Sequence, residues 1–489
     1  MYKYLTIIIW GLLAFSWLYP YHYAPWLVAE NEFLILLIPC ILGLSLIKNK
    51  KLKVNDFFIF ILVLLYFSLI QYLLLDYYFL EDIVVISIYL IFILLNLIIS
   101  KEYFNKKNAN YFLMVIVFLS IINSIPMLFQ YFNINNIFVL NHFGVRRFYG
   151  NIGQPNHLST IFVMGIVSSI LLYKRNIFDE RILYITSLFL IFLIFLTGSR
   201  TGLLTLFFLL FLTLIFRNDQ KTKLDLRFFG SLILIYFLLD YFFSENSRNS
   251  FREINKTISD SRLTLWEDSI SSILANPWVG YGINGVRTSR LFGNLDFKVP
   301  YVSSHNILID FFLWFGVIGG ASFLIYVLLI CRRIYLDERN SYEIFLFLTP
   351  FAVHCLLEYP FRYLYFLVLI IPVLSVVKGG KIFYIHRSVF IFIIFIYMLL
   401  ISFVYIDFQR YSQSAFFAHI QKCEIKDGEP IVLDLMQKYS YLYCENLSQW
   451  EMRKVIYRYS YDIHIKYYLD LGYFDGNFSR FRYNLESDN

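Results

Sequence analysis

Charged side chains are scarce in this sequence. Asp, Glu, Lys and Arg make up 16% of the 489 residues, whereas hydrophobic residues make up 59% and aromatic residues 20%. Soluble domains usually carry about 25% charged residues, so this composition excludes an ordinary soluble protein. The net charge of +7 does not indicate nucleic-acid binding, because the lysines lie in short clusters between apolar runs. Membrane topology produces that arrangement, and the chain is predicted to lie in a membrane.

Cysteine is scarce as well. The five cysteines form no CxxC pair and no Cys/His grouping with metal-ligand spacing, so neither a zinc site nor a redox motif is indicated. The first apolar segment, 4–19, lacks a small-residue cleavage site before Pro20. We therefore expect a helix that is retained in the membrane rather than a signal peptide.

Long apolar runs fill most of the sequence. A bilayer core about 30 Å thick needs roughly 17–25 apolar residues per helix, and a scan finds about 13 such runs. They lie near 4–19, 32–47, 57–75, 83–100, 111–130, 157–173, 182–197, 201–216, 228–243, 306–330, 343–358, 361–377 and 388–406. The predicted fold is an all-α polytopic membrane protein. Residues 1–406 form its transmembrane domain, 244–305 a large outer loop within that domain, and 407–489 a small helical outer domain.

Loop charge predicts the orientation, because Lys and Arg in short loops are held on the cytoplasmic side. One alternating set of loops carries Lys48, Lys50, Lys51, Lys53, Lys101, Lys106, Lys107, Lys174, Arg175, Arg181, Arg217, Lys221, Lys223, Arg227, Arg332, Arg333, Arg339, Lys378, Lys381 and Arg387. The intervening loops 20–31 and 76–82 contain no Lys or Arg. The amino terminus is thus predicted inside and, with an odd helix count, the carboxyl terminus outside.

Arginine on the predicted outer face breaks this rule. The segment 131–156 carries Arg146 and Arg147, and the long loop carries Arg248, Arg252, Arg262, Arg287 and Arg290. A guanidinium fork binds phosphate oxygens bidentately, so arginines beside the membrane suit an anionic lipid headgroup.

Two polar motifs on the outer side begin apolar runs. Gln154, Asn156 and His157 enter one run after a Gly/Pro turn, and Arg200 lies where two runs meet. Helix amino termini attract phosphate, and charge at membrane depth tends to be functional. The structural alternatives are a simple capped helix start for the first motif and a snorkelling arginine for the second.

Further candidates follow along the chain. Arg262 lies near Trp266 in the long loop, and His305 precedes a run and is a candidate general base, or merely a helix cap. His354 and Glu358 are four apart, one turn on a single helix face, with Arg362 just beyond. Two ligands without a thiolate make a poor metal site. We expect a hydrogen-bonding pair that faces the site, or a structural pair.

These residues carry a family resemblance. The stretches in order are QPNH at 154–157, GSR at 198–200, SRLTLW at 261–266, NPWVGYG at 276–282 and SHN at 304–306, followed by Gly316, Gly319 and Gly320. This order resembles the O-antigen ligase and polymerase superfamily over roughly 150–380. QPNH and the HxxxEYP stretch at 354–360 are most similar to the branch of bacterial protein O-oligosaccharyltransferases that glycosylate pilins and other exported proteins.

The resemblance implies a bacterial inner-membrane enzyme that works on the periplasmic face. The donor would be an undecaprenyl-pyrophosphate-linked glycan and the acceptor a Ser or Thr hydroxyl of an exported protein, with no metal or nucleotide cofactor. By matching motif, His305 would be the essential histidine, and Arg200 and Arg262 would engage the pyrophosphate. Gln154, Asn156, His157, His354, Glu358 and Arg362 are expected to orient sugar or acceptor.

Two other functions remain open on the sequence. An O-antigen ligase or polymerase would use the same chemistry with a sugar acceptor. A transporter or flippase would also have many helices, but it should show charges near mid-bilayer in related halves, whereas here they gather at one face. The sequence also predicts a disulfide between Cys423 and Cys444, the two cysteines of the outer tail.

Overall fold

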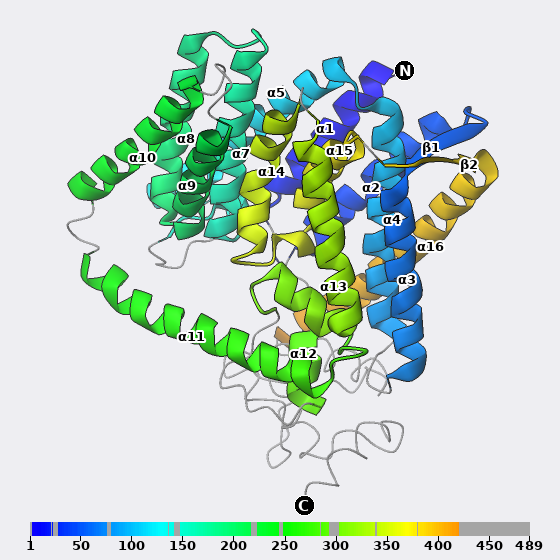
Figure 1. The fold of residues 1–489 in the computed structure, drawn as a ribbon. Helices are drawn as coiled ribbons and strands as arrows, with labels where there is room; N and C mark the ends of the chain where they lie inside the picture. The colour runs from blue at the N-terminus through cyan, green and yellow to red at the C-terminus, as the bar shows by residue number, and fades with distance from the viewer. Residues whose placement is uncertain are drawn as a thin grey trace, which may run out of the picture.

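The structure is a computed structural model. It describes residues 2–20, 22, 28–75, 80–134, 136–140, 147–216, 223–243, 248–283, 285–292, 303–337, 340–378 and 380–419. The α-helices are α1 (Tyr2–Leu18), α2 (Ala29–Leu46), α3 (Asp56–Leu74), α4 (Leu80–Tyr103), α5 (Lys106–Ile122), α6 (Ser124–Tyr131), α7 (Pro155–Lys174), α8 (Glu180–Thr197), α9 (Arg200–Ile215), α10 (Lys223–Phe243), α11 (Arg248–Ala275), α12 (Gly285–Phe292), α13 (Ile307–Tyr335), α14 (Ser341–Cys355), α15 (Leu364–Ser375) and α16 (Arg387–His419). Two short 3₁₀ helices, η1 (Gly150–Ile152) and η3 (Pro360–Arg362), accompany them (Figure 1).

The protein is a mostly helical, polytopic membrane protein. Within the described ranges, nine helices are long and apolar enough to cross a bilayer. Each of the thirteen predicted runs overlaps a helix, and Asn123 divides the run at 111–130 into α5 and α6. The count of about 13 spans, and the inside position of the amino terminus, stay predictions.

Several helix ends differ from the sequence-based boundaries, and two of them bear on the site and on the predicted outer domain. α14 ends at Cys355 rather than at 358, because Pro360 follows closely and the residue before a proline avoids helical geometry. α16 continues past 406 to His419. Most of the predicted outer domain at 407–489, including Cys423 and Cys444, lies outside the described residues.

A two-stranded sheet joins the two ends of the predicted transmembrane domain, and the sequence analysis did not predict it. β1 (Lys51–Asn55) pairs antiparallel with β2 (Ile382–His386), in a register that runs from Lys51 opposite His386 to Asn55 opposite Ile382. β1 alternates exposed lysines with Leu52 and Val54, which are buried. Both strands come from loops that share a predicted side of the membrane, which agrees with their pairing.

α7 forms the centre of the bundle. Every residue from His157 to Leu172 is buried, including the polar residues His157, Ser159, Thr160, Ser168 and Ser169, so other helices surround α7 on all sides. It packs against α5, α8, α9 and α14. A Cβ at Gly165 would lie 2.6 Å from Oγ of Ser120 on α5, so the absence of a side chain there lets the two helices approach closely.

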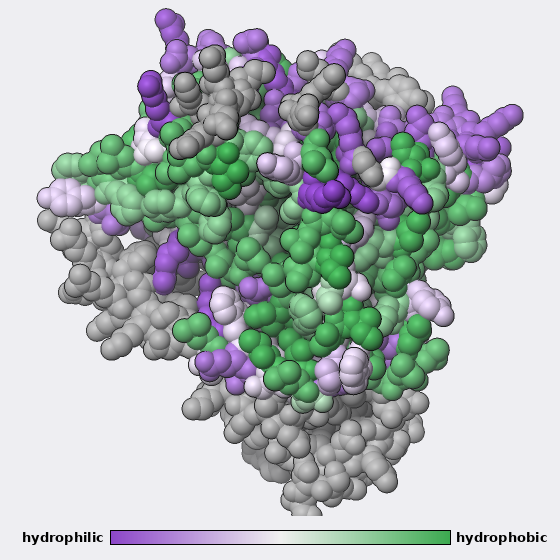
Figure 2. Space-filling view, viewed as in Figure 1, coloured by the Kyte–Doolittle hydropathy of each residue, from purple (hydrophilic) through white to green (hydrophobic). Residues whose placement is uncertain are grey.

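The two ends of the molecule differ in chemistry. Figure 2 shows hydrophilic side chains gathered at the end that carries β1 and β2, above a broad hydrophobic band. Ion pairs tie helix ends together there: Lys174 with Asp225, Arg175 with Glu343 at 2.6 Å, and Arg333 with Asp56 at 2.5 Å. The opposite end collects the starts of α7, α9 and α13 and the end of α14, and it holds the polar cluster described next.

Candidate functional site

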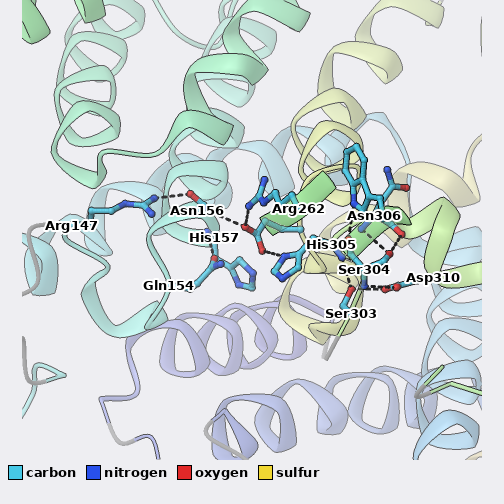
Figure 3. Close-up of polar contacts among 12 residues, drawn as sticks. Arg147, Gln154, Asn156, His157, Arg262, Ser303, Ser304, His305, Asn306 and Asp310 are labelled. Carbon is cyan, nitrogen blue, oxygen red and sulfur yellow. Dashed lines mark hydrogen bonds and ion pairs between the residues drawn. The ribbon is translucent and has the colours of Figure 1, made fainter. Parts of the chain in front are cut away.

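The carboxylate of Glu358 joins three side chains from distant parts of the chain. Its Oε1 accepts hydrogen bonds from Nη2 of Arg262 at 2.6 Å and from Nδ2 of Asn156 at 3.2 Å. Its Oε2 lies 2.7 Å from Nδ1 of His305. Figure 3 shows Asn156, Arg262 and His305 converging from α7, from α11 and from the segment before α13. Glu358 is only 4% exposed, so its two oxygens are held by protein partners.

The surroundings keep this carboxylate charged. Burial raises the pKa of Glu358. The hydrogen bond and charge of His305, together with the charge of Arg262, lower this pKa by more than burial raises it, so the net pKa lies below the ordinary value. An anionic carboxylate accepts only, so Nδ1 of His305 must donate to it. The other ring nitrogen, Nε2, is then the atom that can exchange a proton with a substrate.

His305 has an unusual backbone conformation. Its φ of +59° lies in the left-handed region, which a residue with a side chain seldom adopts. Nearby groups fix it: the N–H of His305 donates to Oγ of Ser303 at 3.1 Å, and that hydroxyl donates to Asp310 at 2.5 Å. Such strain persists only where the surroundings impose it, and it clusters at functional sites.

Asp310 organises this turn from inside α13. It is fully buried, and its Oδ1 accepts the N–H of Ser304 at 2.8 Å. Asn306 caps α13 by accepting the N–H of Leu308 at 3.0 Å, and Nε1 of Trp266 donates to the carbonyl of Ser304 at 2.9 Å. The sequence analysis missed Asp310. Its only signal was a carboxylate at the start of an apolar run, where charge is costly.

The start of α7 is built by capping. Gln154 accepts the N–H of His157 through Oε1 at 2.8 Å, and Pro155 occupies the first turn. The capped helix start that the sequence analysis considered is thus present, and the orienting role of Gln154 stays a prediction. Asn156 points to the site instead: its Oδ1 accepts from Ser199 Oγ and from Nη2 of Arg147, both at 2.8 Å.

Three arginines surround the site. Arg200 is the first residue of α9 and is exposed, and its side chain forms no hydrogen bond or ion pair with the described residues. Arg147, which the sequence analysis did not select, donates Nε to the carbonyl of Thr197 at 3.2 Å. Burial and the nearby charges of Arg200 and Arg262 lower the pKa of Arg147, although the charge of Glu358 opposes this. Arg262 bonds Glu358 directly, and Arg147 is linked to Glu358 through Asn156. Arg200 directly follows Ser199, whose hydroxyl donates to the same Asn156 oxygen as Arg147.

His157 and His354 lie behind this surface. Nδ1 of His157 bonds the hydroxyl of Tyr365 at 2.5 Å, and Nδ1 of His354 bonds Oγ1 of Thr160 at 2.8 Å. Their rings are 5.1 Å apart, and they are 1% and 0% exposed. The expectation that His354 and Glu358 share a helix face was wrong, because α14 ends before Glu358 and the two side chains turn to different partners.

Arg362 points away from the shared carboxylate. Its Nη2 donates to the carbonyl of Ile283 at 3.1 Å, and its guanidinium lies over the ring of Trp314 at 5.2 Å. It thus fastens the segment after α14 to the loop after α11. Within the described part of the chain, no group of three His, Cys, Asp or Glu side chains is arranged to hold a metal ion.

Two family models and two relatives show what this chain is similar to. An O-antigen ligase family model matches residues 185–324, and a protein glycosylation ligase family model matches 149–173. The ComP-specific O-oligosaccharyltransferase of Acinetobacter baylyi is 28% identical over 342 residues, covering 65% of this chain. The general O-oligosaccharyltransferase of the same organism is 24% identical over 388 residues, covering 73%.

The chain spans 61% of the length of the first of these relatives and 66% of the second. The matches confirm the predicted resemblance to protein O-oligosaccharyltransferases of the O-antigen ligase superfamily. The two family models together contain Gln154, Asn156, His157, Arg200, Arg262 and His305, whereas His354, Glu358 and Arg362 lie beyond them.

Proposed function

We propose that this protein is a membrane glycosyltransferase that moves a glycan from undecaprenyl pyrophosphate to a Ser or Thr hydroxyl of an exported protein such as a pilin. Transfer would take place on the periplasmic face of a bacterial inner membrane. The observation that carries the proposal is the buried Glu358 carboxylate, which holds a histidine and an arginine on its two oxygens. No metal or nucleotide cofactor is part of the proposal.

The arginines suit the donor. Among the described residues, Arg262 bonds Glu358 through Nη2 alone, and its other N–H groups are proposed to bind phosphate oxygens. Arg200 lies exposed at the first turn of α9, where backbone N–H groups also favour an anion. Pyrophosphate is already a good leaving group, and holding its developing charge is the main demand on the protein. In this proposal Arg200 and Arg262 bind the pyrophosphate, and Arg147 adds to the local positive potential.

The histidine suits the acceptor. With Nδ1 donating to Glu358, His305 can accept the hydroxyl proton on Nε2. The acceptor oxygen then forms a bond to the anomeric carbon. The bond between that carbon and the pyrophosphate oxygen breaks, and the pyrophosphate leaves with the electron pair. Glu358 stabilises the imidazolium that results, as a carboxylate does for a general base elsewhere.

The remaining residues are proposed to orient the substrates, directly or through others. Asn156 lies between Glu358 and Arg147 and is the member of the α7 start that reaches the site. His157 and His354 are buried, so they would act through Tyr365 and Thr160, which they bond.

A protein acceptor is favoured by the names of both relatives, which are O-oligosaccharyltransferases. The alternative is an O-antigen ligase or polymerase with a sugar acceptor, and the O-antigen ligase family model over 185–324 supports it. A transporter or flippase is less well supported, because the charged cluster lies at one end of the bundle.

One experiment separates these functions. The gene would be deleted, and pilin mass and lipopolysaccharide would be examined together, with complementation by the wild type and by His305→Ala. We expect the deletion to remove sugar from protein, the wild type to restore it, and lipopolysaccharide to stay unchanged. Altered lipopolysaccharide with intact glycoprotein would assign a sugar acceptor instead. If the deletion alters neither the glycoprotein nor the lipopolysaccharide, glycan transfer as a whole is contradicted.

A further inference from the structure

α13 is interrupted in its outer third. Gly316 has φ +65° and ψ −171°, which no helix contains. The interruption removes the normal helical partners of the Leu313 and Trp314 carbonyls and of the Val317 N–H. At membrane depth such groups must find partners within the protein, because lipid offers none.

The turn at Asn276–Gly282 supplies those partners. The N–H of Tyr281 donates to the Leu313 carbonyl at 2.7 Å, the N–H of Gly282 to the Trp314 carbonyl at 3.0 Å, and the N–H of Val317 to the Pro277 carbonyl at 2.6 Å. We call this contact between 276–282 and 313–317 the α11–α13 joint. It explains the NPWVGYG stretch as a backbone partner for a broken helix.

Two of the three glycines in the joint, Gly280 and Gly316, tolerate no side chain. Gly280 has φ +73°, and a Cβ there would lie 2.5 Å from the backbone N of Gly316. A Cβ at Gly316 would lie 2.5 Å from the carbonyl O of Trp278. Both clashes are with backbone, so the joint could not relax by moving a flexible side chain.

Gln71 of α3 bridges the two halves of the joint. Its Nε2 donates to the carbonyl of Val279 at 2.7 Å, in the turn, and to the carbonyl of Trp314 at 2.6 Å, in α13. The side chain is fully buried. A buried amide in an apolar helix is costly unless it is hydrogen-bonded, and this one spends both N–H donors on another segment of the chain.

The joint connects the two elements that carry the proposed chemistry. α11 brings Arg262 to Glu358 and leads directly into the turn, while the segment before α13 brings His305 to the same carboxylate. α11 also contacts the segment before α13, where Nε1 of Trp266 donates to the Ser304 carbonyl. Their relative position is thus fixed near the site by Glu358 and farther away by the joint, which Gln71 ties to α3.

We infer that Gln71 is a positioning residue for glycan transfer, which holds the α11–α13 joint so that Arg262 and His305 meet Glu358 in one geometry. The inference rests on the proposed function for its kinetic test but not for its structural one. Gln71 is far from the reacting groups in the sequence and contacts none of them. Its loss should therefore lower turnover more than donor binding, since misplacement of about 1 Å costs roughly a hundredfold in rate.

The test compares Gln71→Leu and Gln71→Glu with a matched control, Ser68→Ala. Ser68 is buried on the same helix, one turn earlier, but its hydroxyl bonds only the Leu64 carbonyl of its own helix. We expect Gln71→Leu to lower kcat by about ten- to hundredfold with the donor KM changed by less than about threefold. Gln71→Glu, which when neutral keeps one O–H donor, should retain an intermediate kcat, and Ser68→Ala should match the wild type.

A second measurement tests the geometry of the α11–α13 joint without an activity assay. Spin labels at Glu267→Cys on α11 and Ser322→Cys on α13, both exposed positions, would report the distance between the two helices in a background without other cysteines. Gln71→Leu should broaden the distribution, and Ser68→Ala should not. If the wild type transfers no glycan, the proposed function is contradicted, but the distance measurement still tests the role of Gln71 in the joint.

Two results would overturn the inference. They are wild-type kcat in Gln71→Leu, whatever its distance distribution, and a lost kcat with an unchanged distribution. If Gln71→Leu fails to insert or aggregates, Gln71→Glu carries the same comparison.

Discussion

Nδ1 of His305 lies 2.7 Å from Oε2 of Glu358, although 53 positions separate the two residues in the sequence. The carboxylate orients the ring and selects the tautomer with its proton on Nδ1. The left-handed backbone of His305 brings the ring to this contact. Geometry rather than residue type thus distinguishes His305 from His157 and His354, which are buried behind the site.

Replacing His305 by Ala should abolish transfer without loss of membrane insertion. His305 lies before α13 rather than within a membrane-spanning helix, and general-base catalysis, the role proposed for it, contributes about 10²–10⁴-fold to rate. Transfer from a purified lipid-linked donor would be measured for equal amounts of inserted protein. His386→Ala, an exposed histidine on β2, is the matched control. Wild-type turnover by His305→Ala would remove the base assignment.

Exchanging Arg200 or Arg262 for Lys should weaken the enzyme although charge is kept. The ammonium loses the bidentate fork, and a hydrogen bond to a charged group is worth about 1.5–3 kcal/mol, or roughly ten- to hundredfold. Arg262→Lys should also lower kcat, because Arg262 holds Glu358. Donor kinetics would be compared with Arg181→Lys, an exposed arginine near the start of α8. Full activity in both site variants would contradict the proposal that Arg200 and Arg262 bind the pyrophosphate.

Glu358→Gln should give a pH-dependent loss of stability. His305 and Arg262 outweigh burial and hold the pKa of Glu358 below its ordinary value. Its carboxylate therefore stabilises the fold above the unfolded-state pKa, near pH 4.5, and that contribution is lost as pH falls through the lower folded-state pKa. The unfolding temperature of the wild type should exceed that of the variant by a steady margin from about pH 8 to 5, and the margin should shrink below about pH 4. A margin unchanged at pH 3 would argue against an ionised Glu358.

Reporter fusions test the predicted topology. Fusions after residues 53, 107, 180, 222, 336 and 381 should report the cytoplasm, because these positions follow the lysine-rich and arginine-rich loops. Fusions within 244–305 or after 410 should report the outer compartment. A cytoplasmic signal after 410 would mean that one helix had been miscounted.

Thiol labelling tests the disulfide predicted between Cys423 and Cys444. Cys40, Cys331 and Cys355 are free thiols in the structure, so the denatured, unreduced protein should show three reactive thiols. A bridge of this span should contribute about 3 kcal/mol by the chain-entropy estimate. Labelling of five thiols would exclude the bridge.

Apolar runs predicted the helices well because each run depends on local composition. The cluster at Glu358 depends instead on where side chains point after a helix has ended, and the end of α14 was misplaced by three residues. Arg262, His305 and Glu358 were each named as candidates from the sequence, but the contacts that join them were not predicted. Arg147 was named only as one of the outer arginines, because the sequence gives no sign of its partners, here Thr197 and Asn156.

Contacts between backbone segments that are far apart in the chain could not be predicted from the sequence, for a related reason. The turn at 276–282 was recognised by its Pro and Gly. Its partner in the structure is the kink at Gly316, and the sequence of neither segment indicates that they pair. Gln71 gave no signal except an amide in an apolar run. Such pairings depend on tertiary approach, which hydropathy and propensity do not encode.

The pairing of β1 with β2 sets an order for assembly. Asn55 and Ile382 are opposite each other in the sheet, yet about 330 residues separate them, so at about 5–20 residues per second the partner strand is made roughly 15–65 s later. During that interval β1 has open backbone groups at the membrane surface while the intervening helices insert. Ribosome-bound chains stopped before β2 should therefore expose β1 to protease, and completion of β2 should protect it.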